Sequence, residues 1–590
     1  MLGKIIGVEG NTILVKSKIN IEEANNIINL YVKFTDGDIK IIGEIVDIKD
    51  NIIYINLVGE FKNNKFMYGI SSKPSFRSTV DILEHDKIIE ILGIPDYNER
   101  KDLYLGRSPI YSDVKIGINI NDFFSNHFAI FGSTGSGKSC SVARIFQNLF
   151  EKNDPVPYRA SILIFDAYGE YHSAFCELSN KVPEITFKSY TTNTNDSNNL
   201  KLQLPFWLLT VDDIALLLEA DKRSELPIIE KALKLVNIFA RKESENVLKS
   251  KNDIIARALI DILSSGHSPA QIRDQIFSVL SHYNTKDLNL DTQIFQPGYT
   301  RPLKQCLLID STGKIREMEL LTTFIGKFIC DDLELSLPDG TFKYTLKDFY
   351  MAFEFALISE GILNSEKVYD MYNSLKVRLR TLLNSEYAKY FDIPEYMNID
   401  SFIKDILTIN HRKAQIVNFN INYVDDRFAK TIVKIYSRIF FEYAKGLDNR
   451  ASLPIHIILE EAHRYVQNDN DINVIGYNIF ERISKEGRKY AVMLGLISQR
   501  PSELSSTALS QCSNFLIFKM MHPTDVEYIK QMVPNITSEI VKKLKLLQPG
   551  TCIAFGSGFK VPSLIKFKLP NPTPSSSSCD ISNIWFVDRK

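Results

Sequence analysis

A glycine-rich segment, GSTGSGKS at 132–139, constrains what this chain can fold into more than any other feature. It follows an apolar run at 127–131 and precedes a segment whose apolar residues share one helical face: Val142, Ile145, Phe146, Leu149 and Phe150. Glycines let the backbone turn tightly enough for consecutive N–H groups to converge, and a helix start adds unpaired donors and partial positive charge. A GxxxxGK[ST] pattern between a strand and a helix therefore predicts a phosphate-binding loop, or P-loop.

The predicted nucleotide site includes every residue of this loop. Lys138 is expected to reach the β- and γ-phosphates, and the Ser139 hydroxyl is expected to ligate Mg²⁺. The preceding residues are expected to cradle the phosphates: Gly132, Ser133, Thr134, Gly135, Ser136 and Gly137. A glycine-rich turn without a ligand could have the same sequence pattern, but the strand–loop–helix context favours a nucleotide-binding site.

Two adjacent carboxylates supply the second motif. The segment IHIILEEAH at 455–463 is an apolar strand that ends in Glu460 and Glu461. At the end of a neighbouring strand, Glu460 is expected to orient the hydration shell of Mg²⁺, and Glu461 to polarise the water that attacks the γ-phosphate. The alternative is a pair of solvated acids at a helix start, where the helix dipole favours negative charge. Beside a P-loop, the pair indicates ATP hydrolysis rather than ATP binding alone, with ATP and Mg²⁺ as cofactors.

Composition limits the class of protein. The 590 residues are 44% hydrophobic and 24% charged, with a formal net charge of -1, which is typical of a globular chain without an overall basic field. No apolar run approaches the roughly 18 residues of a membrane-spanning helix. The 7 cysteines are scattered and form no CxxC pair, so a reduced, cytoplasmic protein without a membrane partner is expected.

Hydrophobic patterns predict an α/β fold in five segments. Short Ile- and Val-rich runs at 11–15, 28–34, 39–46 and 52–58 predict a small β-barrel over residues 1–110. Strands alternating with helices predict a core with a parallel sheet, in two parts at 111–204 and 406–568. The helical period between them predicts a mainly helical insertion at 205–405, and residues 569–590 are expected to form an extended tail.

Several motifs in a fixed order resemble the HerA/FtsK superfamily of ring-forming, DNA-translocating ATPases, and HerA most closely. They are HFAIFGSTGSGKS at 127–139, ILIFDAYGEY at 162–171, LEEAHRYV at 459–466, EGRKYAVMLGLISQRPSEL at 486–504 and PGTCIAFGSGFKVPSLIKF at 549–567. The resemblance covers nearly the whole chain. It implies a RecA-like P-loop ATPase core and an N-terminal barrel that serves assembly.

Four further residues receive candidate roles. Asp166, at a strand end, is expected to position water or metal, and Gln499 to sense the γ-phosphate; each also has a plain structural interpretation as a turn acid or a core polar residue. The resemblance implies that Arg488 is an arginine finger, which would reach the nucleotide of a neighbouring subunit. Arg500 is the competing candidate.

The leading hypothesis is an ATP-driven homo-hexamer that moves double-stranded DNA through a central pore. The resemblance implies a partner, either a NurA-like nuclease or another effector, in DNA end processing or anti-phage defence. The alternative is an ATP-regulated ring scaffold that assembles and activates an effector with little translocation. A secretion or conjugation ATPase of the same superfamily is a weaker interpretation. The sequence shows no clustered metal-ligating carboxylates of its own for cutting DNA.

Overall fold

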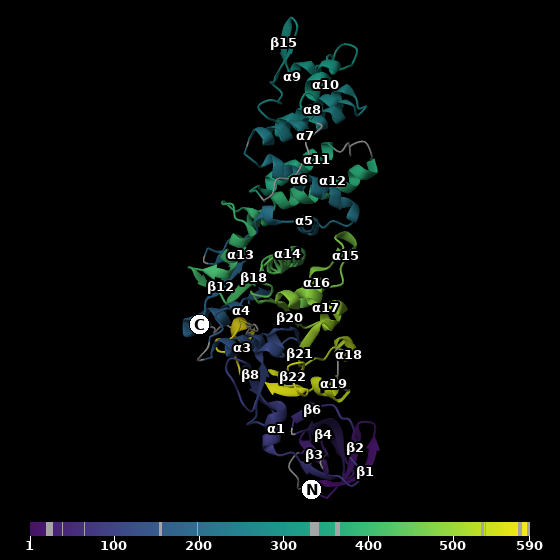
Figure 1. Ribbon diagram of the computed structural model, residues 1–590, viewed down its shortest axis with the longest axis vertical. Coiled ribbons are helices and arrows are strands. Elements are labelled where there is room, and N and C mark those ends of the chain that lie inside the picture. Colours follow the sequence, from purple (N-terminus) through teal and green to yellow (C-terminus); the bar gives the residue numbers. More distant parts are fainter. Residues whose placement is uncertain are drawn as a thin grey trace.

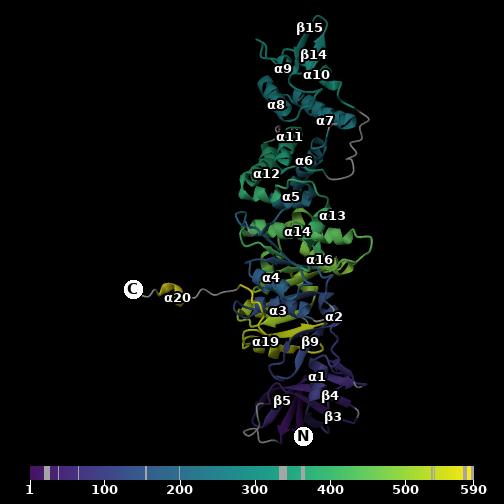
Figure 2. The same ribbon diagram turned by 90° about the vertical axis from the view of Figure 1, so that its left-hand side faces the viewer.

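A computed structural model describes residues 1–18, 27–37, 39–63, 65–152, 156–197, 199–242, 244–330, 342–359, 366–532, 536, 538–575 and 581–586. The molecule is elongated, with a β-sheet domain at one end, a helical region at the other and an α/β core between them (Figures 1 and 2). Within the described residues, no helix has the length and apolar character needed to span a membrane.

The N-terminal domain is a curled antiparallel sheet. Its strands follow the order β1-β2-β5-β4-β3-β7, with β6 beside β5. The backbone N–H of Leu2 donates to the carbonyl oxygen of Val80 at 2.7 Å, which brings the two ends of this order together as in a barrel. The four runs predicted as strands are confirmed as β2 to β5. The strands are β1 (Gly3–Glu9), β2 (Thr12–Ser17), β3 (Tyr31–Asp36), β4 (Ile39–Lys49), β5 (Ile52–Lys62), β6 (Lys65–Tyr68) and β7 (Thr79–Ile82).

The strands that follow the barrel belong to the core. After α1 (His85–Leu92), β8 (Asp102–Arg107) pairs with β9 (Lys115–Asn119) and with β23 of the core sheet. The barrel strands thus end at Ile82, and a boundary at residue 110 would divide a core hairpin. Short strands with turns have the same sequence pattern in either sheet, so the pattern does not reveal which sheet a strand joins.

The core is a 12-stranded sheet in the order β13-β12-β18-β11-β19-β20-β10-β21-β22-β23-β8-β9. The strands from β13 to β21 run parallel, and those from β21 to β9 pair antiparallel. The predicted core strands are confirmed. The remaining strands are β10 (His127–Phe131), β11 (Ile162–Asp166), β12 (Phe187–Thr191), β13 (Leu200–Lys201), β18 (Ile416–Asn420), β19 (Ile455–Leu459), β20 (Val492–Ser498), β21 (Cys512–Phe518), β22 (Thr551–Gly556) and β23 (Ser563–Lys566).

Helices cover both faces of the sheet, as the alternation of strands and helices predicted. Phe128 and Ile130 of β10 pack in one apolar cluster with α3 (Lys138–Phe150) and α4 (Tyr171–Lys181). The intervening Ala129 and Phe131 pack in a second cluster with α14 (Asp426–Lys445) and α16 (Ile479–Glu486). Shorter helices complete the core: α2 (Ile120–Phe124), α15 (Asp471–Val474), α17 (Ser506–Ser510), α18 (Pro523–Met532) and α19 (Ser538–Leu544).

The insertion predicted to be helical extends from the core and shares its second apolar cluster. An ion pair of 2.5 Å between Arg438 of α14 and the buried Asp213 anchors its base. Its far end carries a hairpin that the sequence did not predict, β14 (Gln293–Gln296) and β15 (Tyr299–Pro302) (Figure 1). Its helices are α5 (Val211–Leu217), α6 (Leu226–Phe239), α7 (Glu245–Leu263), α8 (Pro269–His282), α9 (Leu303–Cys306), α10 (Met318–Gly326), α11 (Leu346–Ser359), α12 (Glu366–Asn384) and α13 (Ile399–Leu407).

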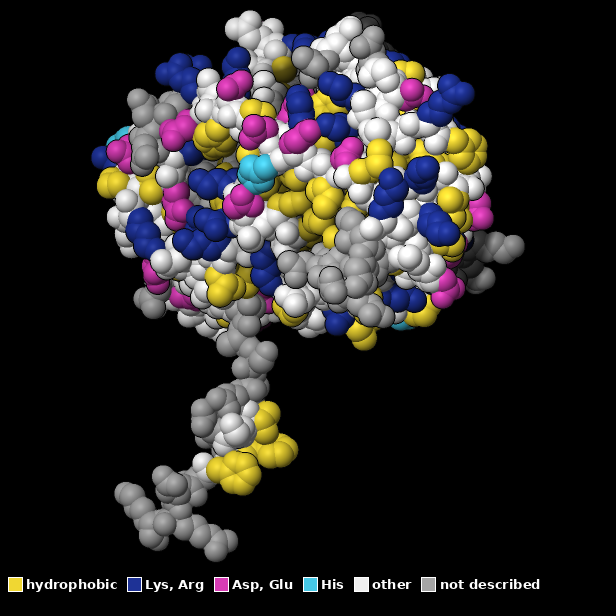
Figure 3. Space-filling view, turned by 90° about the horizontal axis from the view of Figure 1, so that it is seen from below, with side chains coloured by type: hydrophobic (Ala, Val, Ile, Leu, Met, Phe, Trp, Pro, Cys, Tyr) yellow, Lys and Arg dark blue, Asp and Glu magenta, His cyan; other side chains and the backbone are white. Residues whose placement is uncertain are grey.

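The first part of the C-terminal tail is fixed to the core. The fully buried Gln147 of α3 donates to the carbonyl oxygen of Pro572 at 2.8 Å and accepts from the Asn571 N–H at 2.9 Å. The Ser575 N–H donates to the carbonyl oxygen of Glu170 at 2.8 Å. Beyond it, the short α20 (Ile581–Trp585) exposes large apolar side chains away from the body of the molecule (Figures 2 and 3).

Candidate nucleotide site

Parallel strands bring most of the predicted site residues to one edge of the sheet. The P-loop follows β10, Asp166 ends β11, the Glu460–Glu461 pair follows β19, and Gln499 follows β20. Because β20 lies between β10 and β19, Gln499 emerges between the P-loop and the carboxylates. The carboxyl ends of parallel strands are the usual location of ligand sites in such sheets.

The P-loop is shaped by glycines and fixed at both sides. Gly135 and Gly137 have φ values of 72° and 94°, in the left-handed region that favours glycine. A Cβ on Gly137 would lie 2.7 Å from the backbone nitrogen of Gly550, so the loop and this neighbouring turn need glycine to pack. The N–H of Ser133 donates to the carbonyl oxygen of Lys519 at 2.8 Å, and that of Gly550 to Ser136 at 2.9 Å.

Lys138 and Ser136 have polar atoms that a phosphate can satisfy. Lys138 Nζ donates to the carbonyl oxygen of Gly132 at 2.7 Å, and burial lowers the pKa of this ammonium against the attraction of nearby carboxylates. Ser136 Oγ is buried without a hydrogen-bond partner. Phosphate oxygens would offer Lys138 a stronger, charge-assisted partner than the loop's own carbonyls. The loop therefore fits a nucleotide phosphate chain.

Glu461 has a strained backbone and an unbonded carboxylate oxygen. Its φ of 50° and ψ of 49° are uncommon for a residue with a side chain, and such strain clusters at functional sites. Its Oε2 lies 3.2 Å from His463 Nδ1 but is buried without a hydrogen bond. The same His463 Nδ1 lies 3.1 Å from Ser498 Oγ at the end of β20. An unbonded carboxylate oxygen beside the P-loop can accept a proton from water.

Glu460 lies deeper than its neighbour. It is 3% exposed, and its Oε2 accepts a hydrogen bond of 2.7 Å from the Tyr171 hydroxyl. Burial raises the pKa of Glu460 to about 8, although the Tyr171 hydrogen bond and the Lys138 charge oppose that shift. A cation bound nearby would favour the ionised carboxylate. The predicted role of Glu460 toward Mg²⁺ is thus compatible with its place.

Asp166 holds a turn. Its Oδ1 accepts from the N–H groups of Gly169 and Glu170 at 2.8 and 3.0 Å, and its Oδ2 from that of Tyr171 at 2.9 Å. This fully buried carboxylate therefore orients the residues that enter α4. Among them, Glu170 accepts a hydrogen bond from the Ser139 hydroxyl. Glu170 belongs to the motif at 162–171 but received no predicted role; its position four residues after the end of β11 was the available signal.

The two arginine candidates lie in different places. Gln499 Oε1 accepts from the Thr134 hydroxyl at 2.7 Å, so Gln499 contacts the P-loop directly. Arg500 is the next residue and pairs with Glu503 at 2.8 Å on the surface. Arg488 precedes β20, at the opposite edge of the sheet, where its charge contributes to lowering the pKa of His127 after the larger effect of burial. Arg488 is therefore remote from the P-loop of its own chain.

Oxygen ligands at the carboxyl edge suit Mg²⁺. Ser139, Glu170 and Glu460 offer a hydroxyl and two carboxylates beside Lys138, the hard donors that this cation prefers. Across the described parts of the chain, no group of three or more His, Cys, Asp or Glu side chains could hold a metal ion by itself. A cation here would depend on phosphate oxygens for the rest of its coordination shell.

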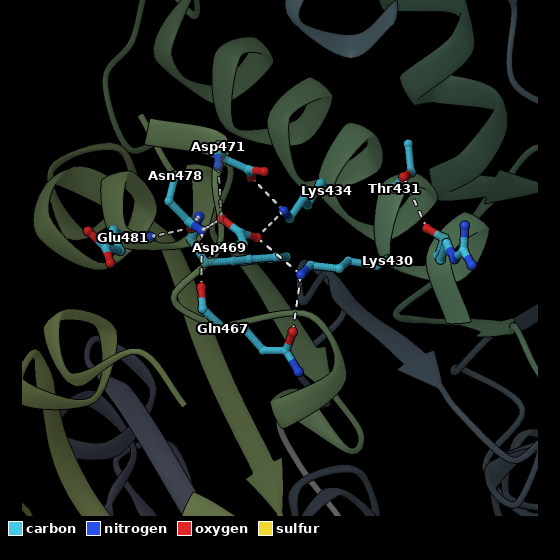
Figure 4. A network of polar contacts seen from close by, with 10 residues as sticks. Lys430, Thr431, Lys434, Gln467, Asp469, Asp471, Asn478 and Glu481 are labelled. Carbon is cyan, nitrogen blue, oxygen red and sulfur yellow. Dashed lines mark hydrogen bonds and ion pairs between the residues drawn. The ribbon is translucent and has the colours of Figure 1, made fainter. Parts of the chain in front are cut away.

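A buried ionic network anchors the segment between Glu461 and α16 (Figure 4). Lys434 of α14, with 3% of its side chain exposed, pairs with Asp469 and Asp471 at 2.5 Å each. Lys430 also pairs with Asp469, at 3.2 Å, and Asn478 Nδ2 donates to Asp469 Oδ1 at 3.2 Å. Because a buried ammonium is costly without partners, this network fixes the segment on α14.

Comparisons with known proteins agree with this geometry. Residues 103–306 match the family model described as the helicase HerA central domain. A probable helicase of Methanocaldococcus jannaschii is 23% identical over 558 residues, spanning 91% of this chain and 84% of that protein. The DNA double-strand break repair helicase HerA of Saccharolobus solfataricus is 22% identical over 581 residues, spanning 94% and 90%. That of Sulfolobus acidocaldarius is 25% identical over 489 residues, spanning 82% and 72%.

Solved structures that are similar to this chain include VirB4 of Thermoanaerobacter pseudethanolicus. The two have a TM-score of 0.44 and are 13% identical, over 80% of this chain and 97% of VirB4. The bacterial conjugative coupling protein TrwB has a TM-score of 0.40 and 10% identity over 77% and 87%. The chain is a P-loop ATPase, and the family match over residues 103–306 and the relatives that span most of the chain make it similar to HerA helicases.

Proposed function

We propose that this ATPase forms a ring of six subunits that moves double-stranded DNA through a central pore. It would act with a NurA-like nuclease or another effector, in DNA end processing or anti-phage defence. One observation carries the proposal: the P-loop, the unbonded Glu461 carboxylate and Gln499 meet at one sheet edge. The relatives named as DNA double-strand break repair helicases support DNA as the substrate.

The residues at this edge divide the work of hydrolysis. Lys138 exchanges its carbonyl partner for the β- and γ-phosphates, and Ser139 with Glu170 and Glu460 would hold hydrated Mg²⁺. When bound, the cation neutralises charge on the phosphate oxygens. Glu461 Oε2 takes the proton of the attacking water.

Gln499 would register the loss of the γ-phosphate. It contacts Thr134 of the P-loop and stands at one end of β20, whose other end follows Arg488. A buried strand moves as a rigid unit, so a displacement of Gln499 would also displace the residues at the other end of β20, at the opposite edge of the sheet. In a ring, that edge would present Arg488 to the neighbouring nucleotide; Arg500 stays the alternative finger.

The experiment measures ATP hydrolysis and displacement of a third strand from a triplex, with and without double-stranded DNA. Wild-type protein is expected to show DNA-stimulated hydrolysis and displacement, and Glu461→Gln to lose both while it still binds ATP. Glu527→Gln, a surface acid on α18, is the matched control and should behave as wild type. If Glu461→Gln protein still activates an effector and DNA never stimulates hydrolysis, the ring scaffold is the better function.

A further inference from the structure

A row of three cations crosses the antiparallel end of the core sheet. Lys115 of β9 stands directly opposite Arg107 of β8, and Arg107 stands opposite Lys566 of β23. Directly opposed residues project from the same face of a sheet, on strands about 4.8 Å apart. Like charges in this arrangement destabilise a sheet, so the row needs an explanation.

Within the described residues, the row has no carboxylate to neutralise it. The ion pair near this end of the sheet joins Arg144 of α3 to Glu151 at 3.1 Å and involves none of the three cations. Lys566 Nζ donates instead to the carbonyl oxygen of Pro549 at 2.8 Å, which leaves its charge uncompensated. Three adjacent charges of one sign attract a ligand that carries several negative charges.

The row lies in a groove of about 820 Å³. Two of the residues that line it, Tyr104 and Arg107, belong to β8, which is labelled in Figure 1 between α3 and α1. Tyr104 of β8 and Gly117 of β9 stand opposite each other along it, and a Cβ on Gly117 would lie 3.0 Å from Ile94. Beside the row, the lining includes one more cation, Lys568, together with Arg144, which is paired with Glu151, and the half-exposed Tyr97.

We propose that this groove binds a single strand of nucleic acid, with phosphates on the cations and a base against Tyr97 or Tyr104. Channels for single strands combine a cationic path with aromatic rings on which unpaired bases stack. Paired bases of a duplex are inaccessible to rings within a groove, and an acidic peptide would use the cations but not the rings. The proposal rests on the proposed function only for the source of the strand, which is the DNA that the ring moves.

The first test measures the anisotropy of a labelled oligo-dT of about 12 nucleotides, a length within the range of such sites. It uses full-length Lys138→Ala protein without nucleotide, so that ATP-driven steps cannot contribute. Adding Lys115→Ala and Lys568→Ala should weaken oligo-dT binding at least tenfold but duplex binding no more than twofold. The slope of log K against log salt should fall by about 1.4, because each lost phosphate contact on a single strand contributes about 0.7.

Two further variants separate charge from stacking. The pair Lys286→Ala and Lys314→Ala removes exposed cations on the helical insertion and should leave oligo-dT binding within twofold. Tyr97→Leu keeps an apolar side chain but removes the ring, and should weaken oligo-dT binding about fivefold, the lower end of a stacking contact. Inorganic polyphosphate, which has no bases, should bind Tyr97→Leu and its parent protein equally. Photo-crosslinking of 4-thiothymidine in the oligonucleotide should label peptides that contain Tyr97 or Tyr104.

Three results would overturn the proposal. Unchanged oligo-dT binding after loss of Lys115 and Lys568 would remove the groove as the site. Equal losses of affinity for duplex and for oligo-dT, together with unchanged oligo-dT binding by Tyr97→Leu protein, would assign the cations to duplex phosphates. Displacement of oligo-dT by polyaspartate at equal affinity would indicate an acidic protein partner. Failure of Glu461→Gln to affect triplex displacement would contradict the proposed translocase but would leave these ATP-free measurements untouched.

Discussion

The carboxyl and amino edges of the core sheet bury different kinds of titratable group. The carboxyl edge buries one basic side chain, Lys138, and two acidic ones, Glu460 and Glu461, around the P-loop. The Oε2 atom of Glu461 has no hydrogen-bond partner in the described part of the chain. Burial lowers the pKa of Lys138 and raises that of Glu460 to about 8. Perturbed titratable groups gathered around one loop are typical of a site for a charged ligand.

The amino edge holds two buried histidines, each with one ring nitrogen bonded to the backbone, while the other nitrogen of His127, Nε2, has no hydrogen-bond partner among the described residues. His456 Nε2 lies 2.7 Å from the carbonyl oxygen of Phe124, and the N–H of Leu494 donates to His127 Nδ1 at 2.9 Å. Burial lowers the pKa of both rings to about 4, so they stay neutral near pH 7. The difference teaches that a ligand site is marked by several buried titratable groups around one phosphate-binding loop, whereas buried neutral rings at the other edge serve packing.

The largest expected effect concerns the amino edge and the neighbouring subunit. Arg488→Ala should still bind ATP and assemble, but its kcat for hydrolysis should fall on the order of 10³-fold or more, as for other arginine fingers. Lys489→Ala, the adjacent cation, is the matched control. Mixing Arg488→Ala with Lys138→Ala should restore part of the activity, because an intact P-loop can then face an intact arginine. Full activity of Arg488→Ala together with loss in Arg500→Ala would assign the finger to the carboxyl edge.

The next effect concerns the carboxyl edge alone. Glu461→Gln keeps the shape of the side chain but cannot take a proton from water, so hydrolysis should fall about 10²- to 10⁴-fold. Binding of a fluorescent ATP analogue should stay within a few-fold of wild type. Hydrolysis at the wild-type rate would transfer the role of base to Glu460, Glu170 or Asp166.

A smaller effect concerns the segment that joins the two edges. Lys434→Met would leave Asp469 and Asp471 buried without their ammonium, and breaking a buried pair costs about 3 to 5 kcal/mol. Lys430→Met is the matched control, because Lys430 is more exposed and pairs with Asp469 alone, for which we expect about 1 kcal/mol or less. Chemical denaturation measures both, and equal losses would show that the network in Figure 4 is not centred on Lys434.

How far the sequence could predict this molecule differs between the same regions. The carboxyl edge was readable because the P-loop and the Glu460–Glu461 pair are contiguous motifs at strand ends. The anchoring role of Asp166 was hidden, since three of its four side-chain hydrogen bonds come from backbone groups that any sequence would supply, and the fourth comes from the distant Asn418. The cation row on β8, β9 and β23 was also hidden, because Arg107, Lys115 and Lys566 meet only through strand register.

The smallest effect is the dependence of stability on pH, and the two edges should oppose each other. His456 has a native pKa of about 4, below its usual 6.5, so the unfolded chain binds more protons between these values. Stability is therefore present above about pH 6.5 and is lost as pH falls toward 4, by at most about 1.4 kcal/mol per pH unit for each histidine. Glu460 has a native pKa of about 8, above its usual 4.5, so the folded chain binds the extra proton. Its contribution is present below about pH 4.5 and is lost as pH rises through 8.

The midpoint of urea unfolding, measured from pH 5 to 8.5 on ligand-free protein, should report both limbs of this pH dependence. His456→Gln, whose amide can still donate to Phe124, should flatten only the acid limb, and Glu460→Gln, which still accepts from Tyr171, only the alkaline limb. Mg²⁺ with ATP should also flatten the alkaline limb, because a bound cation favours the ionised carboxylate. An alkaline limb that Glu460→Gln leaves unchanged would mean that burial at the carboxyl edge does not control its charge.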